Sequence, residues 1–315
     1  MIAFIIKSLG WLLFAKIVYH LAWCVFLAYI WKGYDLIQRY GKGSWALITG
    51  STDGIGYAFA EELVKRGFNM VLTGRNKEKV ALKVEQLKKL NSSIKVKGIV
   101  VDFAKPDFMD VLREELKKEE IDISLVINNV ATMLEEDYGH LKEDEAKRSI
   151  QLNCIPQALI LNHYLQILNK RSKRSGVIDV SSCLGIAPCG DSAFQSGIKS
   201  FTRATTLAIQ QTRAFKNVDH MCLMPGWTKT NMLKDYPFTL ITRSPEEVVT
   251  GALRGLGMTA ESFGCPGHIL SGAMRQALTF VVPNAWQELI ITRLEYYLRT
   301  FCVIPLENAD SKKEK

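Results

Sequence analysis

Apolar and polar positions divide the chain into an apolar leader and a longer part in which strand and helix patterns alternate. Residues 44–56 read as an apolar strand that runs into a glycine-rich turn, and a helical pattern follows over residues 57–66. The alternation then repeats, with strand patterns at 69–73, 94–101 and 123–127 and a helical pattern at 78–90. This order predicts an α/β fold, a doubly wound parallel sheet of the Rossmann type with ligands at the carboxyl ends of its strands.

The glycine-rich turn is the first candidate for a ligand site. Gly50, Gly54 and Gly56 allow positive φ and a close approach of backbone to a pyrophosphate. The helix that follows adds the positive end of its dipole. A glycine triad alone is equally compatible with a plain turn. Because a strand precedes this one and a helix follows it, we expect a phosphate cradle.

The leader, residues 1–31, is apolar except for Lys7 and Lys16 and is long enough to span a bilayer. A central lysine costs about 2.5–3.5 kcal/mol on insertion scales, so a re-entrant or interfacial arrangement stays open beside a spanning one. A cleaved signal peptide is a further alternative, but no small-x-small cleavage site ends the segment. We therefore expect a membrane anchor at 1–31 and a linker at 32–43.

Positive charges give the expected orientation of the anchor. Lys32, Arg39 and Lys42 follow the leader, which places the remaining chain in the cytosol by the positive-inside rule. The chain ends with Lys312-Lys-Glu-Lys315, which resembles the dilysine signal that returns membrane proteins to the endoplasmic reticulum. A solvated charged tail is the alternative. The two signals together predict an endoplasmic reticulum membrane protein that faces the cytosol.

Composition narrows the partners. The chain has 40 basic and 32 acidic residues and a net charge of +8, which suits an anionic membrane surface or an acyl-CoA. No basic helix or aromatic-laced patch accompanies the charge, so nucleic acid is not an expected partner. Seven cysteines without a Cys-x-x-Cys pair favour neither a disulfide framework nor a zinc site, and no metal site is predicted.

Several segments match, in order, the landmarks of the short-chain dehydrogenases/reductases: Thr49–Gly56, Asn128–Val130, Ser181–Ser182, Lys199 and Pro225–Thr230. The match covers roughly residues 44 to 260 and most resembles the membrane-bound 17-beta-hydroxysteroid dehydrogenases and very-long-chain 3-oxoacyl-CoA reductases. The resemblance implies an NADP(H)-binding oxidoreductase domain at 44–265 that acts on a lipophilic ketone or an acyl-CoA-like molecule. An apolar C-terminal extension at 266–305 and a polar tail at 306–315 would follow.

The resemblance also implies catalytic roles. Asn153 would organise a proton-relay water, Ser182 would bind the substrate carbonyl, and Lys199 would bind the nicotinamide ribose and lower the pKa of a tyrosine. Ordinary structural roles are the alternatives: an asparagine bonded to a helix carbonyl, a serine that caps a turn and an exposed lysine. Gln195 stands at the tyrosine's position, four residues before Lys199 and thus on the same helix face.

A carboxamide cannot deliver the proton that the phenol would supply, and general acid–base catalysis typically contributes about 10²–10⁴-fold. Gln195 and Ser182 can still donate hydrogen bonds, which would leave some stabilisation of the substrate oxygen. Tyr138, Tyr164 and Tyr236 are the tyrosines that folding could bring to the site as a replacement. Whether the chain is an active enzyme is therefore open at this point.

Two further residues depart from the family pattern. Ala131 replaces a usual glycine and adds a methyl group near the cofactor, and Asp179 replaces a usual asparagine just before the serine pair. Either change is also compatible with a working enzyme.

The expected cofactor is NADP(H). Arg75 follows the second strand, where no acidic residue is present to bind a ribose diol, and its guanidinium suits a 2′-phosphate. A plain loop arginine is the alternative, and the Ser51 hydroxyl would add a contact to the same phosphate. The resemblance implies further cofactor contacts from Gly50, Asp53, Gly54, Ile55, Gly56, Asp102, Asn128, Val130, Lys199, Pro225, Gly226, Thr228 and Thr230.

The C-terminal part should form the substrate side. Residues 231–242 read as a lid, and Ser244 begins a helix with Pro245 at its first position and Glu247 completing a capping box. Residues 272–301 are apolar and aromatic-rich, which suits a pocket cover or membrane contact as well as core packing.

Three hypotheses follow. The chain is an NADP(H)-binding homologue with impaired or lost turnover, an active reductase with a substitute proton donor, or a non-catalytic cofactor- or lipid-binding partner. In the third case it would pair as a homo- or heterodimer through the helices around Asn153 and Lys199, the surface at which this family commonly dimerises.

Overall fold

The computed structural model of the chain describes residues 2–119, 121–134, 138–233 and 241–282, together with residues 286, 290, 293 and 297. Within these ranges seven strands form one parallel sheet in the order β3-β2-β1-β4-β5-β6-β7. The strands are β1 Trp45–Ile48, β2 Asn69–Gly74, β3 Val96–Val100, β4 Ile123–Asn128, β5 Ser175–Val180, β6 Val218–Leu223 and β7 Glu261–Ser262. The predicted doubly wound α/β fold is confirmed.

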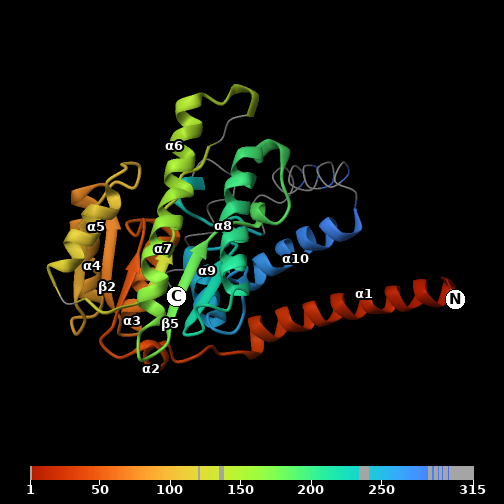
Figure 1. The fold of residues 1–315 in the computed structure, drawn as a ribbon, viewed down its shortest axis with the longest axis horizontal. Coiled ribbons are helices and arrows are strands. Elements are labelled where there is room, and N and C mark those ends of the chain that lie inside the picture. The colour runs from red at the N-terminus through yellow and green to blue at the C-terminus, as the bar shows by residue number, and fades with distance from the viewer. Residues whose placement is uncertain are drawn as a thin grey trace, which may run out of the picture.

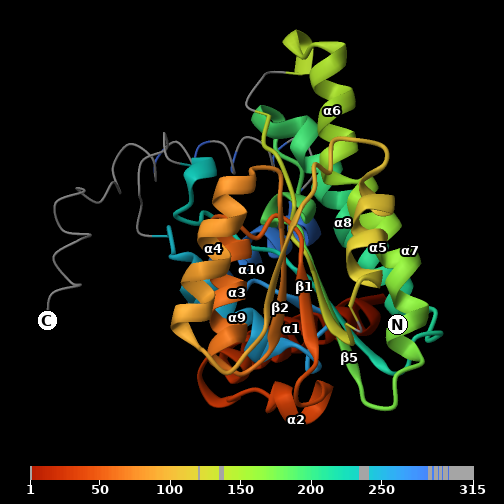
Figure 2. The ribbon, with the colours of Figure 1, turned by 90° about the vertical axis from the view of Figure 1, so that its left-hand side faces the viewer.

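Helices cover both faces of this sheet, and further helices lie outside these two layers. The helices are α1 Ile2–Val25, α2 Leu36–Tyr40, α3 Gly54–Lys65, α4 Lys77–Leu90, α5 Phe108–Lys117, α6 Glu143–Asn153, α7 Ile155–Asn169, α8 Ala193–Gln211, α9 Pro245–Gly255 and α10 Pro266–Val281. The shorter helices are the π-helix η1 Phe26–Ile30 and the 3₁₀-helices η2 Tyr138–His140, η3 Cys183–Gly185, η4 Gly190–Ser192 and η5 Asn231–Leu233. Figure 2 shows α3, α4 and α9 on one face of the sheet and α5, α7 and α8 on the other.

The strands form where the apolar runs occur because a parallel sheet covered on both faces needs apolar side chains in both directions. β1, β4 and β6 are buried at every position. The expected strands and the helix at 78–90 lie within two residues of the observed β2, β3, β4 and α4. The capping box at the start of α9 is confirmed, since Glu247 N donates to Ser244 Oγ and Ser244 N to the Glu247 carboxylate.

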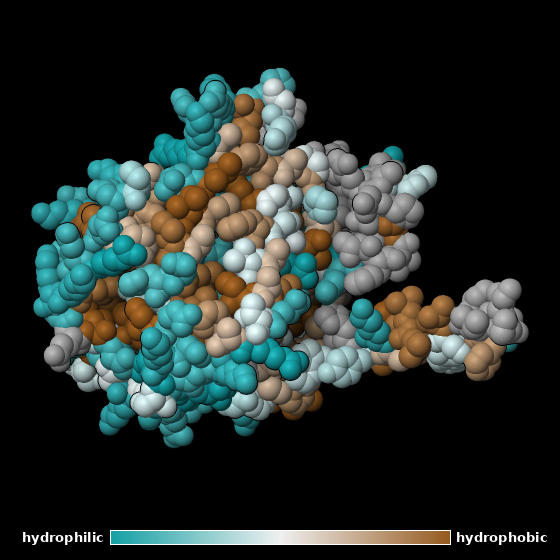
Figure 3. All heavy atoms as spheres, viewed as in Figure 1, coloured by the Kyte–Doolittle hydropathy of each residue, from teal (hydrophilic) through white to brown (hydrophobic). Residues whose placement is uncertain are grey.

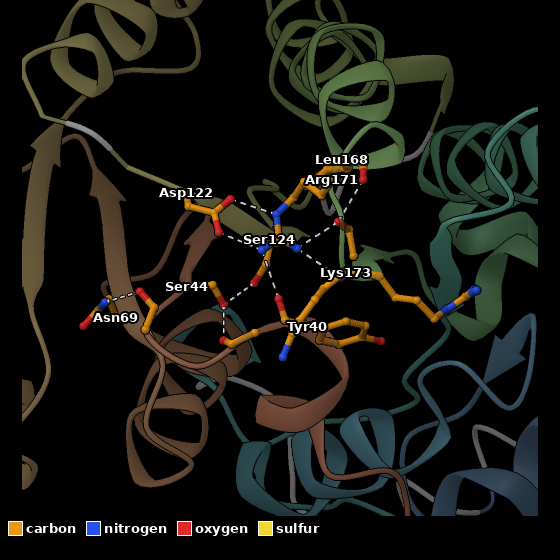
Figure 4. A network of polar contacts seen from close by, with 12 residues as sticks. Tyr40, Ser44, Asn69, Asp122, Ser124, Leu168, Arg171 and Lys173 are labelled. Atoms are coloured by element: carbon orange, nitrogen blue, oxygen red, sulfur yellow. Dashed lines mark hydrogen bonds and ion pairs between the residues drawn. The ribbon is translucent and has the colours of Figure 1, made fainter.

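The segment expected to be a linker is instead part of the domain. It contains α2, whose Leu36 and Tyr40 side chains are buried in the core beneath α9 and the sheet. Figure 4 shows the polar contacts at the amino ends of the central strands, where Arg171 donates to Tyr40 O at 3.0 Å and to Asp122 at 2.7 Å. Helix α2 could not be predicted from the sequence, because five residues are too few to show a clear helical periodicity of apolar positions.

Asp219 fixes α2 to the start of β6. Its carboxylate accepts hydrogen bonds from Arg39 Nε at 2.5 Å, Tyr40 Oη at 3.0 Å and Arg174 Nη2 at 2.6 Å. Burial would raise the pKa of Asp219, but the hydrogen bonds from Arg39 and Arg174 lower it overall. A lowered folded-state pKa stabilises the fold at pH values above the ordinary value of about 3.9, and this stabilisation is lost as the pH falls through the folded-state pKa.

We expect Asp219→Asn to lower the free energy of unfolding by about 3–5 kcal/mol at pH 7, because it leaves two arginines beside an uncharged amide. Urea unfolding from pH 7 down to pH 2 measures the effect, which should remain largely present at pH 4 and shrink only as the pH falls further, through the lowered folded-state pKa. Asp110→Asn is the control, since Asp110 forms an exposed pair with Arg113 worth less than about 1 kcal/mol. Equal losses in the two variants would contradict the role given to Asp219.

The N-terminal helix projects from the domain (Figure 1). Its residues Lys7–Val25 have a mean hydropathy of 1.4 and are the one stretch, within the described ranges, that is long and apolar enough to cross a membrane. Where the helical segment ends, Trp31 Nε1 donates to Arg254 O of α9 at 3.0 Å. The apolar leader is thus joined to the domain at a defined point.

Some expectations lie outside the described residues. These are lid residues 234–240 with Tyr236, and most of residues 283–315 with Lys312 to Lys315. The part of the expected C-terminal extension that is described begins as α10, and its His268 is buried against the domain. The domain therefore continues beyond residue 265.

Candidate active site

The turn between β1 and α3 has the geometry of an anion cradle. Gly50 and Gly54 adopt φ angles of +63° and +53°, which side-chain-bearing residues rarely adopt. A Cβ on Gly56 would lie 2.4 Å from Gly50 O, so only glycine allows the first turn of α3 to pack under the loop. The N-terminus of α3 therefore faces the space that this turn encloses.

The side chains of the turn differ from the expectation in one respect. Ser51 is fully buried, and its hydroxyl donates to Thr73 O at 3.1 Å and accepts from Thr73 N at 2.8 Å. It therefore holds the turn to β2 and cannot reach a 2′-phosphate, which contradicts the predicted contact. Asp53 is exposed and caps α3, with its carboxylate accepting from Gly54 N at 2.7 Å.

Two residues in the quoted motifs have structural roles that the sequence did not assign. Thr49 Oγ1 accepts from Asn129 N at 2.8 Å and from Val130 N at 2.9 Å, which joins the end of β1 to the end of β4. Asn129 Nδ2 donates to Thr49 O and Gly50 O, both at 3.0 Å. Together they place Val130 beside Gly50. The sequence could have indicated these roles, because both residues lie within the two motifs that match the family.

The segment after β6 lies over the glycine turn. The Thr230 methyl group would lie 3.0 Å from a Cβ on Gly54, and Asn231 Nδ2 donates to Asp53 at 2.5 Å. Nearer to β6, Thr228 is buried and donates to Gly226 O at 3.1 Å. The described start of the expected lid thus contacts the cradle directly.

The far side of the cradle is more open. Arg75 is exposed directly after β2, and a Cβ on Gly74 would lie 2.7 Å from a methyl group of Thr52. Asp102, at the end of β3, accepts from Ala104 N at 3.0 Å. Arg75 therefore has room to approach a ligand group, whereas Asp102 already stabilises its own loop.

Gln195 and Asn153 both bond to Thr132, just after β4. Gln195 is buried on α8, and its Nε2 donates to Thr132 O at 3.3 Å. Asn153, the last residue of α6, accepts from Thr132 N at 3.1 Å and donates to Ser149 O at 2.8 Å. The glutamine thus ties α8 to the loop, and its amide offers no acid comparable with a phenol.

Ser182 and Lys199 adjoin each other through the end of β5. Ser182 Oγ accepts from Leu184 N at 3.3 Å and so caps η3. Its neighbour Ser181 donates to Lys199 O at 2.7 Å, and Lys199 Nζ donates to Val180 O at 3.4 Å. Ser182 and Lys199 therefore both adjoin the carboxyl end of β5, with the Lys199 amine bonded to the last carbonyl of that strand.

Burial lowers the pKa of Lys199 to about 8. Because the unfolded chain keeps its proton up to the ordinary value of 10.5, the unfolded state binds more protons between these pH values. The stability of the wild-type protein should therefore rise with pH through this window. At pH 7 the folded protein carries the full cost of the buried charge.

Lys199→Met removes that cost. We therefore expect the free energy of unfolding of the ligand-free variant to be about 1–3 kcal/mol higher than that of the wild type at pH 7. The size follows because one pKa unit corresponds to about 1.4 kcal/mol. The difference should shrink at pH 9.5. Chemical unfolding at both pH values measures it, with exposed Lys216→Met as the control. A pH-independent difference, or one shared by the control, would contradict the burial argument.

The tyrosines considered as replacement acids differ in their position relative to the candidate active site. Tyr164, a residue of α7, is buried in a core cluster, and burial raises its pKa far above the ordinary value. Tyr138 is largely exposed on η2, with its ring centroid 6.1 Å from that of Phe194, which precedes Gln195. Tyr138 is thus at the rim of the site, and Tyr236 lies outside the described residues.

Asp179 organises a buried polar cluster beneath the site. Its carboxylate accepts from Asn128 Nδ2 and Thr206 Oγ1, both at 2.7 Å, and lies 2.6 Å from His220 Nε2. Asn128 therefore turns its amide nitrogen to Asp179, which leaves Asn128 Oδ1 buried and without a partner among the described residues. The departure at position 179 has a structural explanation, since it fixes the orientation of Asn128.

Comparisons with known proteins agree with this geometry. Residues 44–239 match the family model described as short chain dehydrogenase. The chain is 30% identical to human 17-beta-hydroxysteroid dehydrogenase type 3, over 88% of this chain and 89% of that protein. It is 29% identical to human very-long-chain 3-oxoacyl-CoA reductase, over 74% and 75% of the two chains.

Solved structures share the fold. A 7beta-hydroxysteroid dehydrogenase superimposes with a TM-score of 0.73 at 22% identity, over 82% of this chain and all of that one. A Sphingobium yanoikuyae short-chain dehydrogenase in complex with NADPH has a TM-score of 0.61 at 21% identity, over 77% and 97% of the two chains. The family match over residues 44–239 and the 30% identity to human 17-beta-hydroxysteroid dehydrogenase type 3 show that the chain is a member of the short chain dehydrogenase family.

Proposed function

We propose that the chain is a membrane-anchored oxidoreductase homologue that binds NADP(H) and has impaired or lost reduction of a lipophilic ketone. The observation that carries the proposal is the contrast between the nucleotide cradle and the catalytic position. Gly50, Gly54 and Gly56 keep the conformation that a pyrophosphate needs, whereas buried Gln195 replaces the proton donor.

Further features support a bound dinucleotide. Asn128 Oδ1 is a buried acceptor that a nucleotide hydroxyl or amino group would satisfy. Val130 lies against Gly50 and would line the path of the nucleotide. NADP(H) supplies hydride when it is bound, and the exposed Arg75 fork favours its 2′-phosphate over the diol of NAD(H).

Fluorescence titration with NADPH and NADH tests the cofactor part of the proposal. We expect the wild type to prefer NADPH and Arg75→Gln to weaken NADPH binding by about 10- to 100-fold, because a charge-assisted hydrogen bond contributes roughly 1.5–3 kcal/mol. NADH binding should not change. Arg113→Gln, at an exposed position of helix α5, is the control. Equal affinity of the wild type for both nucleotides would overturn NADP(H) specificity.

The names of the relatives suggest the substrate class, a ketosteroid or a 3-oxoacyl-CoA. We place the protein in the endoplasmic reticulum membrane, with the domain facing the cytosol, on the basis of the apolar N-terminal helix, the basic residues that follow it and the dilysine end. A spanning and an interfacial helix remain alternatives for this attachment, and protease protection in microsomes distinguishes them.

A second candidate function is that of a partner for another copy or an active relative. Ile150, Leu159, Ile167 and Phe201 are exposed apolar residues on α6, α7 and α8. Figure 3 shows hydrophobic residues gathered on the face that these helices present. Sedimentation analysis with an apolar-to-charge change at Phe201 tests this role.

A third candidate, active turnover, is favoured by the position of Tyr138 beside Phe194.

A further inference from the structure

A cavity of about 880 Å³ lies at the foot of the N-terminal helix, apart from the candidate active site. Its walls come from α1 with η1, from α9, from the edge strand β7 and from the first turns of α10. None of the residues assigned above to the nucleotide or to catalysis lines it. Its volume is within the range of about 300–1,000 Å³ that is usual for small-molecule sites.

Helix α9 gives the cavity its polar wall. The inward face of this helix, with Val248, Val249 and Ala252, packs in the main core. Thr250 and Arg254 are one helical turn apart on the other side and line the cavity. The outer face of α9 therefore meets a space rather than another packed helix.

The opposite wall belongs to the N-terminal segment. Trp23 and Leu27 line the cavity, and the Trp31 indole bonds to Arg254 O. Gly33 then packs so closely on α9 that a Cβ would lie 3.1 Å from Arg254 Cα. This docking fixes apolar residues of the proposed anchor opposite the charged face of α9. Figure 1 shows α1 and α10 leaving the domain on the same side.

The polar wall carries charges of both signs. Glu261 is paired with Arg203 at 2.5 Å, and Glu247 accepts from Ser244 N at 3.2 Å, so both of these carboxylates have partners in the fold. Arg243 lies against the first turn of α10, where a Cβ on Gly267 would be 2.1 Å from its Nε. Glu246, exposed in the first turn of α9 and three residues after Arg243, adds a negative charge at the same wall.

We propose that this cavity binds a zwitterionic glycerophospholipid from the bilayer, and the assignment rests on the proposed membrane attachment. The phosphate would lie beside Arg243 at the positive start of α10, and the amine would face Glu246. The acyl chains would extend along Trp23 and Leu27. An amphiphile of this kind matches a cavity with one apolar wall and one wall of mixed charge.

The test uses the full-length protein in phosphatidylcholine vesicles that contain a phosphatidylcholine with a photoreactive acyl chain. Crosslinked peptides are identified by mass spectrometry. We expect label on the segment around Leu27 and on the α9 peptide. Thr250→Trp should fill the cavity and lower the α9 label at least fivefold, and Arg243→Gln should lower it as well. Arg66→Gln, at the C-cap of α3 and outside the cavity lining, is the control, and circular dichroism reports that each variant is folded.

The outcomes separate the two proposals. Unlabelled phosphatidylcholine should compete better than phosphatidylglycerol, and equal competition would contradict the zwitterionic assignment. Label confined to residues 9–19, or α9 label unchanged in Thr250→Trp, would overturn the cavity site while leaving the anchor in place. Failure of the protein to float with the vesicles would overturn the membrane attachment itself.

Discussion

Gln195→Tyr is expected to raise the rate of NADPH-dependent ketone reduction by about 10²–10⁴-fold, the usual contribution of a positioned general acid. Gln195 lies on the face of α8 that also carries Lys199, and its amide reaches Thr132 O. A tyrosine there would place a phenol on the same helix face as the Lys199 ammonium, which lowers the phenol's pKa and so makes it a better proton donor to the ketone oxygen. NADPH oxidation with estrone or a 3-oxoacyl-CoA measures the gain.

Two comparisons make this result specific. Gln195→Phe supplies the ring without the hydroxyl, so it should show none of the gain, and Gln195→Tyr with Lys199→Met should lose most of it. Because these residues act as a unit, their effects should not be additive. Robust wild-type turnover that Gln195→Tyr barely changes would show that another group already supplies the proton.

Gly56→Ala is expected to abolish nucleotide binding, with a loss of at least about 100-fold in NADPH affinity. Its methyl group would lie 2.4 Å from Gly50 O and 2.5 Å from Asn129 Nδ2, so the turn that cradles the phosphates must move. A displacement of backbone in a turn of this kind removes the N–H groups aimed at the anion. Fluorescence titration with NADPH measures the loss.

Gly139→Ala is the matched control, since no atom lies within 4 Å of its added methyl group, and it should bind NADPH as the wild type does. Gly54→Ala gives a second test if Gly56→Ala does not fold, because its methyl group would meet only the Thr230 side chain at a φ of +53°. Circular dichroism distinguishes lost binding from lost folding. Undiminished NADPH binding by folded Gly56→Ala would contradict the cradle.

Strands β1, β2 and β4 could be predicted from the sequence because they are buried on both faces and read as largely apolar runs. β5 and β6 were not predicted, because polar residues such as Asp179, Asp219 and His220 interrupt their apolar patterns. The glycine turn could also be predicted, since its φ angles and close contacts exclude other residues. By contrast, α2 was missed, because what holds it is a set of long-range bonds to Asp219, 179 and 180 residues away in sequence. No local pattern carries that information.

The direction in which polar side chains point also could not be predicted from the sequence. The motif placed Ser51 at the cradle but could not show that its hydroxyl turns inward to Thr73. Likewise, the sequence showed only that Asp179 departs from the family pattern. The structure shows that its carboxylate contacts Asn128, Thr206 and His220. Which atom a polar group faces depends on neighbours from other strands, and these become adjacent only on folding.

The central claim is that the nucleotide has a site while the ketone has no acid beside it. The most direct measurement is an experimental structure of the wild-type protein with NADP⁺, from which the distance between Ser182 Oγ and the nearest tyrosine hydroxyl is read. We predict that Gln195 occupies that position and that no phenol lies within hydrogen-bonding reach of Ser182. The hydroxyl of Tyr138, Tyr236 or another tyrosine within about 3.2 Å of Ser182 Oγ and facing the nicotinamide would contradict the account.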